Sequence, residues 1–289
     1  MILVTGATGN VGSALLPRLA ERGAPVRALT RSDAARARVE ALGVEAVDGD
    51  LDDPGSLERA MKGCDHLFLL SPVGPDQMMR EMGVVDAAVA AGVGHVVAVS
   101  VTGADPGSQV SFARWHSAVD DYLSQSGLDW TILRPAGFMS LHLWPVYTVR
   151  REGRWYGMTG DGAHAFVDVD DVAEVAAVAL TEAGHQGRIY EVTGPEARSM
   201  PEYAAVLSEF AGRPVDYVDL PPEDFVARMT GAGVPVWMAE SLGTLYWVIR
   251  EGHAATVSNA VEEVTGRPPR SYRDFAAAHR DVFSGPFVP

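Results

Sequence analysis

The chain has 289 residues, 47% of them hydrophobic, which suits one large α/β domain or a core domain with a smaller lobe. Its formal net charge of −15 argues against nucleic acid or anionic membranes as partners, and no apolar run approaches the ~18 residues of a membrane-spanning helix. A single cysteine, Cys64, excludes an internal disulfide and a cysteine-rich metal site. The N-terminal apolar stretch is short and lacks a preceding basic segment, so we expect no signal peptide and a cytoplasmic location.

The N-terminal segment predicts a dinucleotide site. An apolar strand over 1–5 runs into a turn with glycines at 6, 9 and 12, and a helix over 10–22 follows at once. Gly6 allows a tight turn, Gly9 lets the backbone approach a pyrophosphate, and Gly12 lets the helix pack close to the strand. The helix N-terminus then faces the anion. The expected cofactor ligands are Gly6, Thr8, Gly9, Asn10, Val11 and Gly12; the alternative is a packing turn without a ligand.

Short apolar strands and helices alternate as far as Pro135. We expect further strands at 25–30, 44–48, 65–70, 95–100 and 129–134, and helices at 33–42, 54–62, 76–91 and 111–126. Strands without polar alternation are typical of a parallel sheet covered on both faces. Residues 1–135 therefore predict an α/β fold with a doubly wound parallel Rossmann sheet.

After Pro135 the pattern changes. Residues 136–165 are rich in aromatic residues and glycine, and more regular elements follow: a helix at 168–182 that begins at Asp168, Asp170 and Asp171, a strand at 187–193, a helix at 200–211, a strand at 214–219, a helix from Pro221-Pro222, and a helix at 235–250. We assign 136–289 to a small, mixed C-terminal substrate-binding lobe, with 165–193 returning to the core. Ligands bind at the carboxyl ends of parallel strands, where this lobe closes the site. Candidate substrate contacts are Phe138, His142 and Trp144; alternatively, these aromatics form the core of the lobe.

The end of the second strand favours NADP(H). NAD-specific sites usually place an acid roughly 20 residues after the glycine turn to bind the ribose 2′-hydroxyl. Here the strand ends in Arg31 and Ser32, a guanidinium and a hydroxyl that suit a 2′-phosphate. Asp33 comes one residue late for the acid and is otherwise a helix N-cap. NADP(H) is therefore the expected cofactor, and NAD(H) is the alternative.

The third and fourth strands end in further candidate cofactor contacts. Asp50 and Leu51 follow the third strand, where they are placed to flank the adenine. Asp50 is equally well explained as a helix N-terminal residue. Ser71 and Pro72 follow the fourth strand and are expected beside the nicotinamide ribose, with a simple turn as the alternative.

Together these motifs resemble the atypical short-chain dehydrogenase/reductases of the NmrA-like type. The resemblance covers roughly residues 1–220 and is carried by Thr5-Gly-Ala-Thr-Gly-Asn-Val-Gly12, Val26-Arg-Ala-Leu-Thr-Arg31, Gly49-Asp-Leu51, Ser126-Gly-Leu-Asp-Trp-Thr-Ile-Leu-Arg-Pro135 and Asp168-Val-Asp-Asp-Val-Ala173. It implies a Rossmann fold that binds NAD(P), with a small C-terminal substrate lobe. The family includes quinone reductases, isoflavone-type reductases and redox-sensing regulators without catalysis, so the reaction stays open.

The expected active site departs from the Tyr-x-x-x-Lys pair of standard short-chain dehydrogenases. The only lysine is Lys62, and Glu58 stands four residues before it. On the helix over 111–126, Phe112 occupies the tyrosine position and His116 the lysine position. We expect His116 at the nicotinamide, with Asp120 four residues later orienting it and raising its pKa. The alternative is a partly exposed helix histidine with a local charge pair.

The remaining site candidates depend more on the resemblance. Ser100, at the end of the fifth strand, resembles the serine of the standard triad, and Tyr147 is a substitute proton donor. Ser100, His116 and Pro135 complete the expected cofactor set. The other histidines show no metal-ligand spacing, so we predict no metal.

Two function hypotheses follow. The first is an NAD(P)H-dependent oxidoreductase acting on a planar, apolar quinone or conjugated carbonyl, including tailoring of an aromatic polyketide by reduction, oxygenation or ring modification. The second is a non-catalytic, dinucleotide-sensing NmrA-like regulator. A homo-oligomer is compatible with either hypothesis. The aromatic lobe favours the enzyme, and the missing Tyr-x-x-x-Lys pair favours the regulator.

Overall fold

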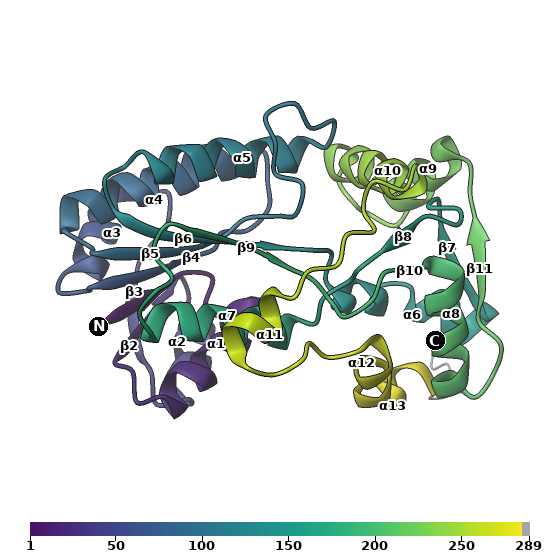
Figure 1. Ribbon diagram of the computed structural model, residues 1–289, viewed down its shortest axis with the longest axis horizontal. Helices are drawn as coiled ribbons and strands as arrows, with labels where there is room; N and C mark the ends of the chain where they lie inside the picture. Colours follow the sequence, from purple (N-terminus) through teal and green to yellow (C-terminus); the bar gives the residue numbers. More distant parts are fainter. Residues whose placement is uncertain (285–289) are drawn as a thin grey trace.

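The computed structural model describes residues 1–284 and is built around a seven-stranded sheet (Figure 1). The strand order is β3-β2-β1-β4-β5-β6-β9, and every neighbouring pair is parallel. The strands are β1 (Ile2–Val4), β2 (Val26–Thr30), β3 (Glu45–Asp48), β4 (His66–Leu69), β5 (His95–Val99), β6 (Asp129–Pro135) and β9 (Arg188–Val192). The doubly wound parallel sheet expected from the sequence is confirmed.

Helices cover both faces of this sheet. One face carries α1 (Asn10–Glu21), α2 (Asp33–Glu40), α7 (Val169–Thr181) and α11 (Ala260–Thr265), and the other carries α3 (Pro54–Met61), α4 (Gln77–Ala91) and α5 (Ser111–Ser124) (Figure 1). Strand residues alternate between two buried clusters, with Ile2 and Val4 on the α1 side and Leu3 on the α4 side. Burial on both faces explains why these strands read as continuous apolar runs.

The second part of the chain forms a mixed lobe with its own aromatic core. It contains η1 (Met139–Leu143), α6 (Val146–Glu152), β7 (Arg154–Gly157), β8 (Ala163–His164), β10 (Arg198–Ser199), α8 (Met200–Ala211), β11 (Asp216–Asp219), α9 (Pro222–Gly231), α10 (Val236–Arg250), α12 (Tyr272–Ala278) and α13 (Arg280–Ser284). Strand β7 pairs in parallel with β11, and β8 pairs antiparallel with β10. The core includes Trp155, Phe166, Tyr203 and Tyr272. Within residues 1–284, none of the helices has the length and hydrophobicity of a membrane-spanning segment.

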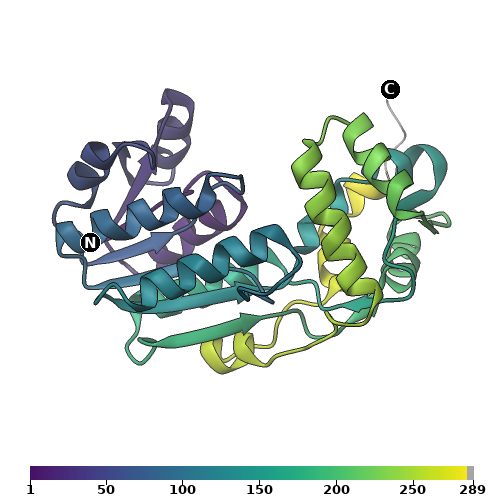
Figure 2. The same ribbon diagram turned by 90° about the horizontal axis from the view of Figure 1, so that it is seen from above.

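The helices α9 and α10 stand at the side of the lobe that faces α5 (Figure 2). Two contacts join α10 to the N-terminal half of α5. The hydroxyls of Ser111 and Ser241 are 2.6 Å apart, and the rings of Trp115 and Trp237 are 5.9 Å apart. The lobe therefore meets the Rossmann half beside the carboxyl ends of the strands.

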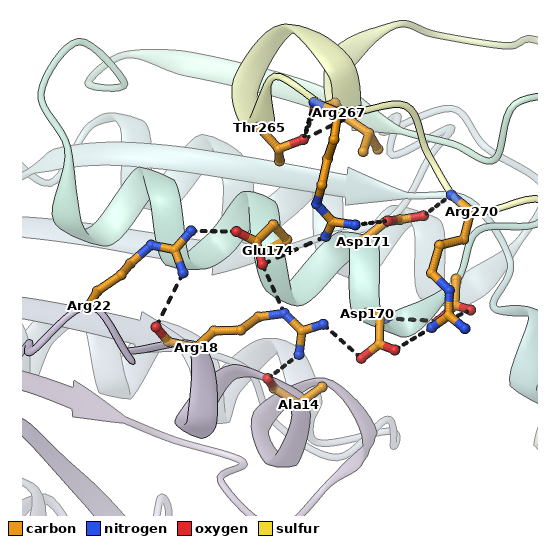
Figure 3. A network of polar contacts seen from close by, with 11 residues as sticks. Ala14, Arg18, Arg22, Asp170, Asp171, Glu174, Thr265, Arg267 and Arg270 are labelled. Atoms are coloured by element: carbon orange, nitrogen blue, oxygen red, sulfur yellow. Dashed lines mark hydrogen bonds and ion pairs between the residues drawn. The ribbon is translucent and has the colours of Figure 1, made fainter. Parts of the chain in front are cut away.

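A charged network fastens the C-terminal segment to the Rossmann half (Figure 3). Arg18 of α1 reaches Glu174 of α7 at 3.0 Å, and Arg267 reaches both Glu174 and Asp171 at 3.6 Å. The backbone N–H of Arg270 donates to the fully buried Asp171 at 2.7 Å. Burial nevertheless raises the pKa of Asp171 to about 6. Asp168 caps α7 by accepting from the N–H of Asp170, so the acid-rich helix start is confirmed.

Candidate functional site

The glycine turn forms a close backbone cradle at the carboxyl end of β1. Gly6 has φ +60°, and a Cβ there would lie 2.9 Å from the carbonyl oxygen of Leu70. A Cβ at Gly12 would lie 2.2 Å from the carbonyl oxygen of Gly6, so Gly12 serves helix packing. At Gly9 the same distance is 3.3 Å, and no side chain among the described residues caps α1. The first N–H groups of α1 therefore suit an anion, as a pyrophosphate requires.

A pocket of about 740 Å³ runs from this turn along the strand ends. Its lining comprises Gly6–Val11, Leu29–Ser32, Ala35, Gly49, Leu51, Leu70–Pro72 and Phe138. Most of the expected cofactor residues thus lie around one cavity, with Phe138 contributed by the segment that follows β6. The five expected residues outside this lining are Gly12, Asp50, Ser100, His116 and Pro135.

Arg31 and Ser32 lie where β2 meets α2. Arg31 is exposed and lines the pocket. The Oγ of Ser32 accepts a hydrogen bond from the N–H of Ala35 at 3.2 Å, which makes Ser32 the N-cap of α2. The N-cap role considered for Asp33 is therefore wrong, because Asp33 is the first residue of the helix itself.

Asp50 forms a local turn before α3. Its Oδ1 accepts from the N–H of Asp52 at 3.1 Å, while Asp53 is the N-cap of the helix. Leu51, and not Asp50, reaches the pocket lining. The arrangement explains Asp50 as a loop residue, with Leu51 as the apolar surface that can meet an adenine ring.

A chain of buried polar groups lies behind Ser71, at the opposite end of the pocket. The Oγ of Ser71 donates to Glu81 Oε1 at 2.7 Å. The side-chain amide of Gln77 lies 3.3 Å from the same oxygen and 3.0 Å from His116 Nε2. Burial lowers the pKa of His116 to about 4, so its imidazole is neutral at pH 7.

The expected pair of His116 and Asp120 is wrong. Asp120 Oδ2 accepts from Arg134 Nη2 at 2.9 Å and from the Oγ of Ser100 at 2.9 Å. Arg134 on β6 offers a full charge to this buried carboxylate, whereas His116 is neutral and is held by Gln77. The expected rise in the pKa of His116 is also wrong, because burial lowers this pKa. Ser100 is engaged in this structural cluster and lies outside the pocket lining.

Sequence reasoning missed Gln77, Glu81 and Arg134. Gln77 and Glu81 lie four residues apart on α4, and both are buried. Polar residues on the buried face of a helix are a signal for a buried network, because unpaired they would cost free energy. Both residues are visible in the sequence, but their partner His116 could be assigned only once the position of α5 against α4 was known.

The three expected substrate residues of the lobe lie in different surroundings. Phe138 lines the pocket. His142 is buried among the rings of Trp155, Phe166, Tyr203 and Tyr272, with ring centroids 4.3 to 5.2 Å away. Neither of its ring nitrogens has a hydrogen-bond partner within the described chain, and burial holds its pKa well below its usual value. This position corrects the expectation that His142 reaches a substrate, because the surrounding rings exclude one.

Trp144 and Tyr147 lie on the surface of the lobe. Trp144 is 58% exposed and Tyr147 is 50% exposed. The hydroxyl of Tyr147 accepts from Arg151 Nη1 at 2.6 Å. Both residues lie outside the pocket lining, so a role for either depends on a substrate that extends beyond the pocket.

The family model that describes NAD(P)H-binding proteins matches residues 6–183, more than half of the chain. The chain belongs to this NAD(P)H-binding family. The matched range contains the glycine turn, Arg31 and the buried chain behind Ser71. The uncapped α1 and the glycine cradle fit the dinucleotide that the family binds, so the cofactor is NAD(P)H.

Several full-length relatives support this assignment. The chain is 40% identical over 284 residues to an NAD(P)H azoreductase of Xenophilus azovorans, covering 98% of this chain and 99% of the relative. It is also 40% identical over 287 residues to the (4-alkanoyl-5-oxo-2,5-dihydrofuran-3-yl)methyl phosphate reductase of Streptomyces griseus, with 98% and 99% coverage. The crystal structure of an NADPH-dependent quinone oxidoreductase of Escherichia coli in complex with NADPH has a TM-score of 0.89 at 28% identity, covering 96% of this chain and 99% of that one. The resemblance found in the sequence is thereby confirmed.

Proposed function

We propose that the protein is an NADPH-dependent reductase of planar, apolar, conjugated acceptors, with quinones as the first substrate class. The observation that carries this proposal is the pocket itself, which runs from Arg31 and Leu51 past the glycine turn to Ser71, Pro72 and Phe138. The glycine turn suits a pyrophosphate, and the ring of Phe138 suits a flat apolar partner. Arg31 at the outer edge supports NADPH over NADH.

The chemistry of the lining favours acceptors that need little acid. Within the described chain, the residues that line the pocket include no Asp, Glu, His, Tyr or Lys. Bound NADPH supplies a hydride, and a quinone takes it up to give a resonance-stabilised anion. The absence of a directly contacting general acid, typically worth ~10²–10⁴-fold, therefore costs a quinone less than a simple ketone. The protein then contributes by holding the reactants close together and in the right orientation.

The names of the relatives support related acceptor classes. They describe reductases acting on azo compounds, on a phosphorylated alkanoyl dihydrofuranone and on quinones. Each of these acceptors is conjugated. We extend the proposal to azo compounds and conjugated carbonyls, including those that arise in aromatic polyketide tailoring.

Steady-state assays with NADPH test the proposal. The panel contains naphthoquinones, an azo dye, a conjugated enone and unactivated ketones, and each is repeated with NADH. We expect quinones to be reduced fastest and unactivated ketones slowest. Efficient reduction of unactivated ketones would overturn the proposed substrate class. Tight NADPH binding with no turnover of any acceptor would overturn the reductase and support the dinucleotide-sensing regulator.

A further inference from the structure

A buried carboxyl group lies one hydrogen bond behind the pocket wall. Glu81 of α4 is 2% exposed, and its Oε1 accepts from the Oγ of Ser71 at 2.7 Å. Ser71 itself lines the pocket. Glu81 is thus connected to the pocket interior through a single hydroxyl group, which can both accept and donate a proton.

The surroundings of Glu81 favour its protonated form. Ser71 and Gln77 face it with hydrogen-bond donors, and Asp120 on α5 acts on it as a like charge. The nearby Arg134 is engaged by Asp120, and no arginine or lysine of residues 1–284 forms an ion pair with Glu81. Burial therefore outweighs the hydrogen bonds and raises the pKa of Glu81 to about 7.

His116 is not a proton source in this arrangement. Its imidazole is neutral, and because the amide nitrogen of Gln77 can only donate, His116 Nε2 accepts from it at 3.0 Å. The same amide nitrogen donates to Glu81 Oε1 at 3.3 Å. His116 and Gln77 are thus positioning residues that orient the carboxyl group of Glu81 toward Ser71.

We propose that Glu81 holds the proton that the reduced acceptor needs and delivers it through the hydroxyl of Ser71. This inference depends on the proposed reductase function. After hydride addition, the acceptor anion takes the hydroxyl proton of Ser71, so a new O–H or N–H bond forms as the Ser71 O–H bond breaks. At the same time Ser71 Oγ accepts the carboxyl proton of Glu81 across the same 2.7 Å contact, since a protonated Glu81 donates in this contact and leaves the hydroxyl proton of Ser71 to the acceptor. Glu81 is left as a carboxylate that Gln77 hydrogen-bonds, and a proton from solvent in the emptied pocket returns to it through the hydroxyl of Ser71 before the next cycle.

The pH profile of kcat/KM tests this relay. With a conjugated enone as acceptor, the wild-type rate should fall as pH rises through about 7, because only protonated Glu81 can donate. Glu81→Gln keeps the shape and hydrogen bonds of the side chain but carries no acid. We expect Glu81→Gln to lose the limb of the profile near pH 7, meaning the fall of kcat/KM as pH rises. Its kcat/KM at pH 6 should be about 10²-fold lower than that of the wild type, with a smaller loss for quinones, whose product anions are more stable.

Substitutions at Ser71 separate the relay from a structural role. Ser71→Ala should lose the same limb as Glu81→Gln, whereas Ser71→Thr retains a hydroxyl and should retain the limb. Glu58→Gln, on α3 and exposed, is the matched control and should leave the profile unchanged. A limb that persists in both Glu81→Gln and Ser71→Ala would overturn the relay.

An infrared titration tests Glu81 without turnover. In the protein without cofactor, the carbonyl stretch of a protonated carboxyl group should titrate near pH 7 in the wild type and be missing in Glu81→Gln. Asp171, whose pKa is raised to about 6, remains in both proteins as an internal reference. No turnover by the wild type would overturn the proposed function and, with it, the relay. Turnover with no titrating band at Glu81 would overturn the relay alone.

Discussion

The two ends of the pocket are built in different ways. The glycine-turn end is centred on backbone from one contiguous segment, Gly6–Val11, and residues that follow β2 and β3, among them Arg31 and Leu51, extend it. The Ser71 end is backed by buried side chains from several elements: Ser71 is hydrogen-bonded to Glu81 of α4, and Gln77 of α4 links Glu81 to His116 of α5. A backbone cradle tolerates few changes at its glycines but needs no partners. In a side-chain network, a substitution of any one residue can change the chemistry of the site. Each residue, however, depends on the others for its hydrogen bonds.

The glycine-turn end can be broken by a single side chain. A Cβ at Gly9 already lies 3.3 Å from the carbonyl oxygen of Gly6, so the branched side chain of Gly9→Val would enter the space of the pyrophosphate. We expect at least a roughly 100-fold loss of NADPH affinity, the equivalent of about 2.7 kcal/mol. Titration calorimetry measures the effect.

A matched glycine on α9 provides the control for this change. A Cβ added at Gly231 would have no atom of the described chain within 4 Å, so Gly231→Ala should leave NADPH affinity unchanged. Circular dichroism checks that both variants are folded. Unchanged affinity in folded Gly9→Val would contradict a dinucleotide site at this turn.

We expect the ion pair of Arg134 and Asp120, beside the Ser71 end, to contribute strongly to the stability of the protein. Arg134→Leu removes the cation that pairs with the buried Asp120 at 2.9 Å. The buried carboxylate is then left uncompensated, which typically costs about 3–5 kcal/mol. Urea denaturation measures the free energy of unfolding, and the double variant Arg134→Leu/Asp120→Leu should recover part of the loss. A loss below about 1 kcal/mol would show that the hydrogen bond from Ser100 is enough to hold the carboxylate or that Asp120 takes up a proton.

The Rossmann half could be predicted from the sequence because its signals are local. Short apolar strands, the glycine turn and the capped helices each depend on neighbouring residues, and the predicted strands agree with the observed ones to within about two residues at each end. The small elements of the lobe, such as α6 and β7, were not predicted. They are short, and tertiary packing around Trp155 and Tyr203, more than local propensity, determines them.

The same distinction applies to the site. The residues of the glycine turn were placed by the spacing of three glycines, which fixes a backbone geometry. The partner of Asp120 was assigned to His116 because the two lie four residues apart, which is a correct rule for one helix. Arg134 on β6 overrides that pairing with a full charge. Only the fold reveals which of several possible partners is nearest.

A smaller effect is expected at the outer edge of the glycine-turn end. Arg31→Ala should weaken NADPH binding by about 1–3 kcal/mol, the range for a charged hydrogen bond, and should leave NADH binding nearly unchanged. Arg31→Lys keeps the charge but lacks the planar guanidinium group, so its NADPH affinity should lie between those of the wild type and Arg31→Ala. Binding titrations with both cofactors measure the difference. Equal losses for NADPH and NADH would mean that Arg31 does not read the 2′-phosphate.

The smallest effect should come from His142, which lies in the lobe core and not in the pocket. His142→Phe removes two ring nitrogens that lack hydrogen-bond partners within the described chain and keeps an aromatic ring among Phe166, Tyr203 and Tyr272. Removing unsatisfied buried polar groups is nearly neutral or stabilising, so we expect an increase of up to about 1 kcal/mol in the free energy of unfolding. The value of kcat/KM for quinones should stay the same, because the surrounding rings separate His142 from the substrate. A tenfold fall in kcat/KM with unchanged stability would instead return His142 to the substrate site and require the lobe to open during turnover.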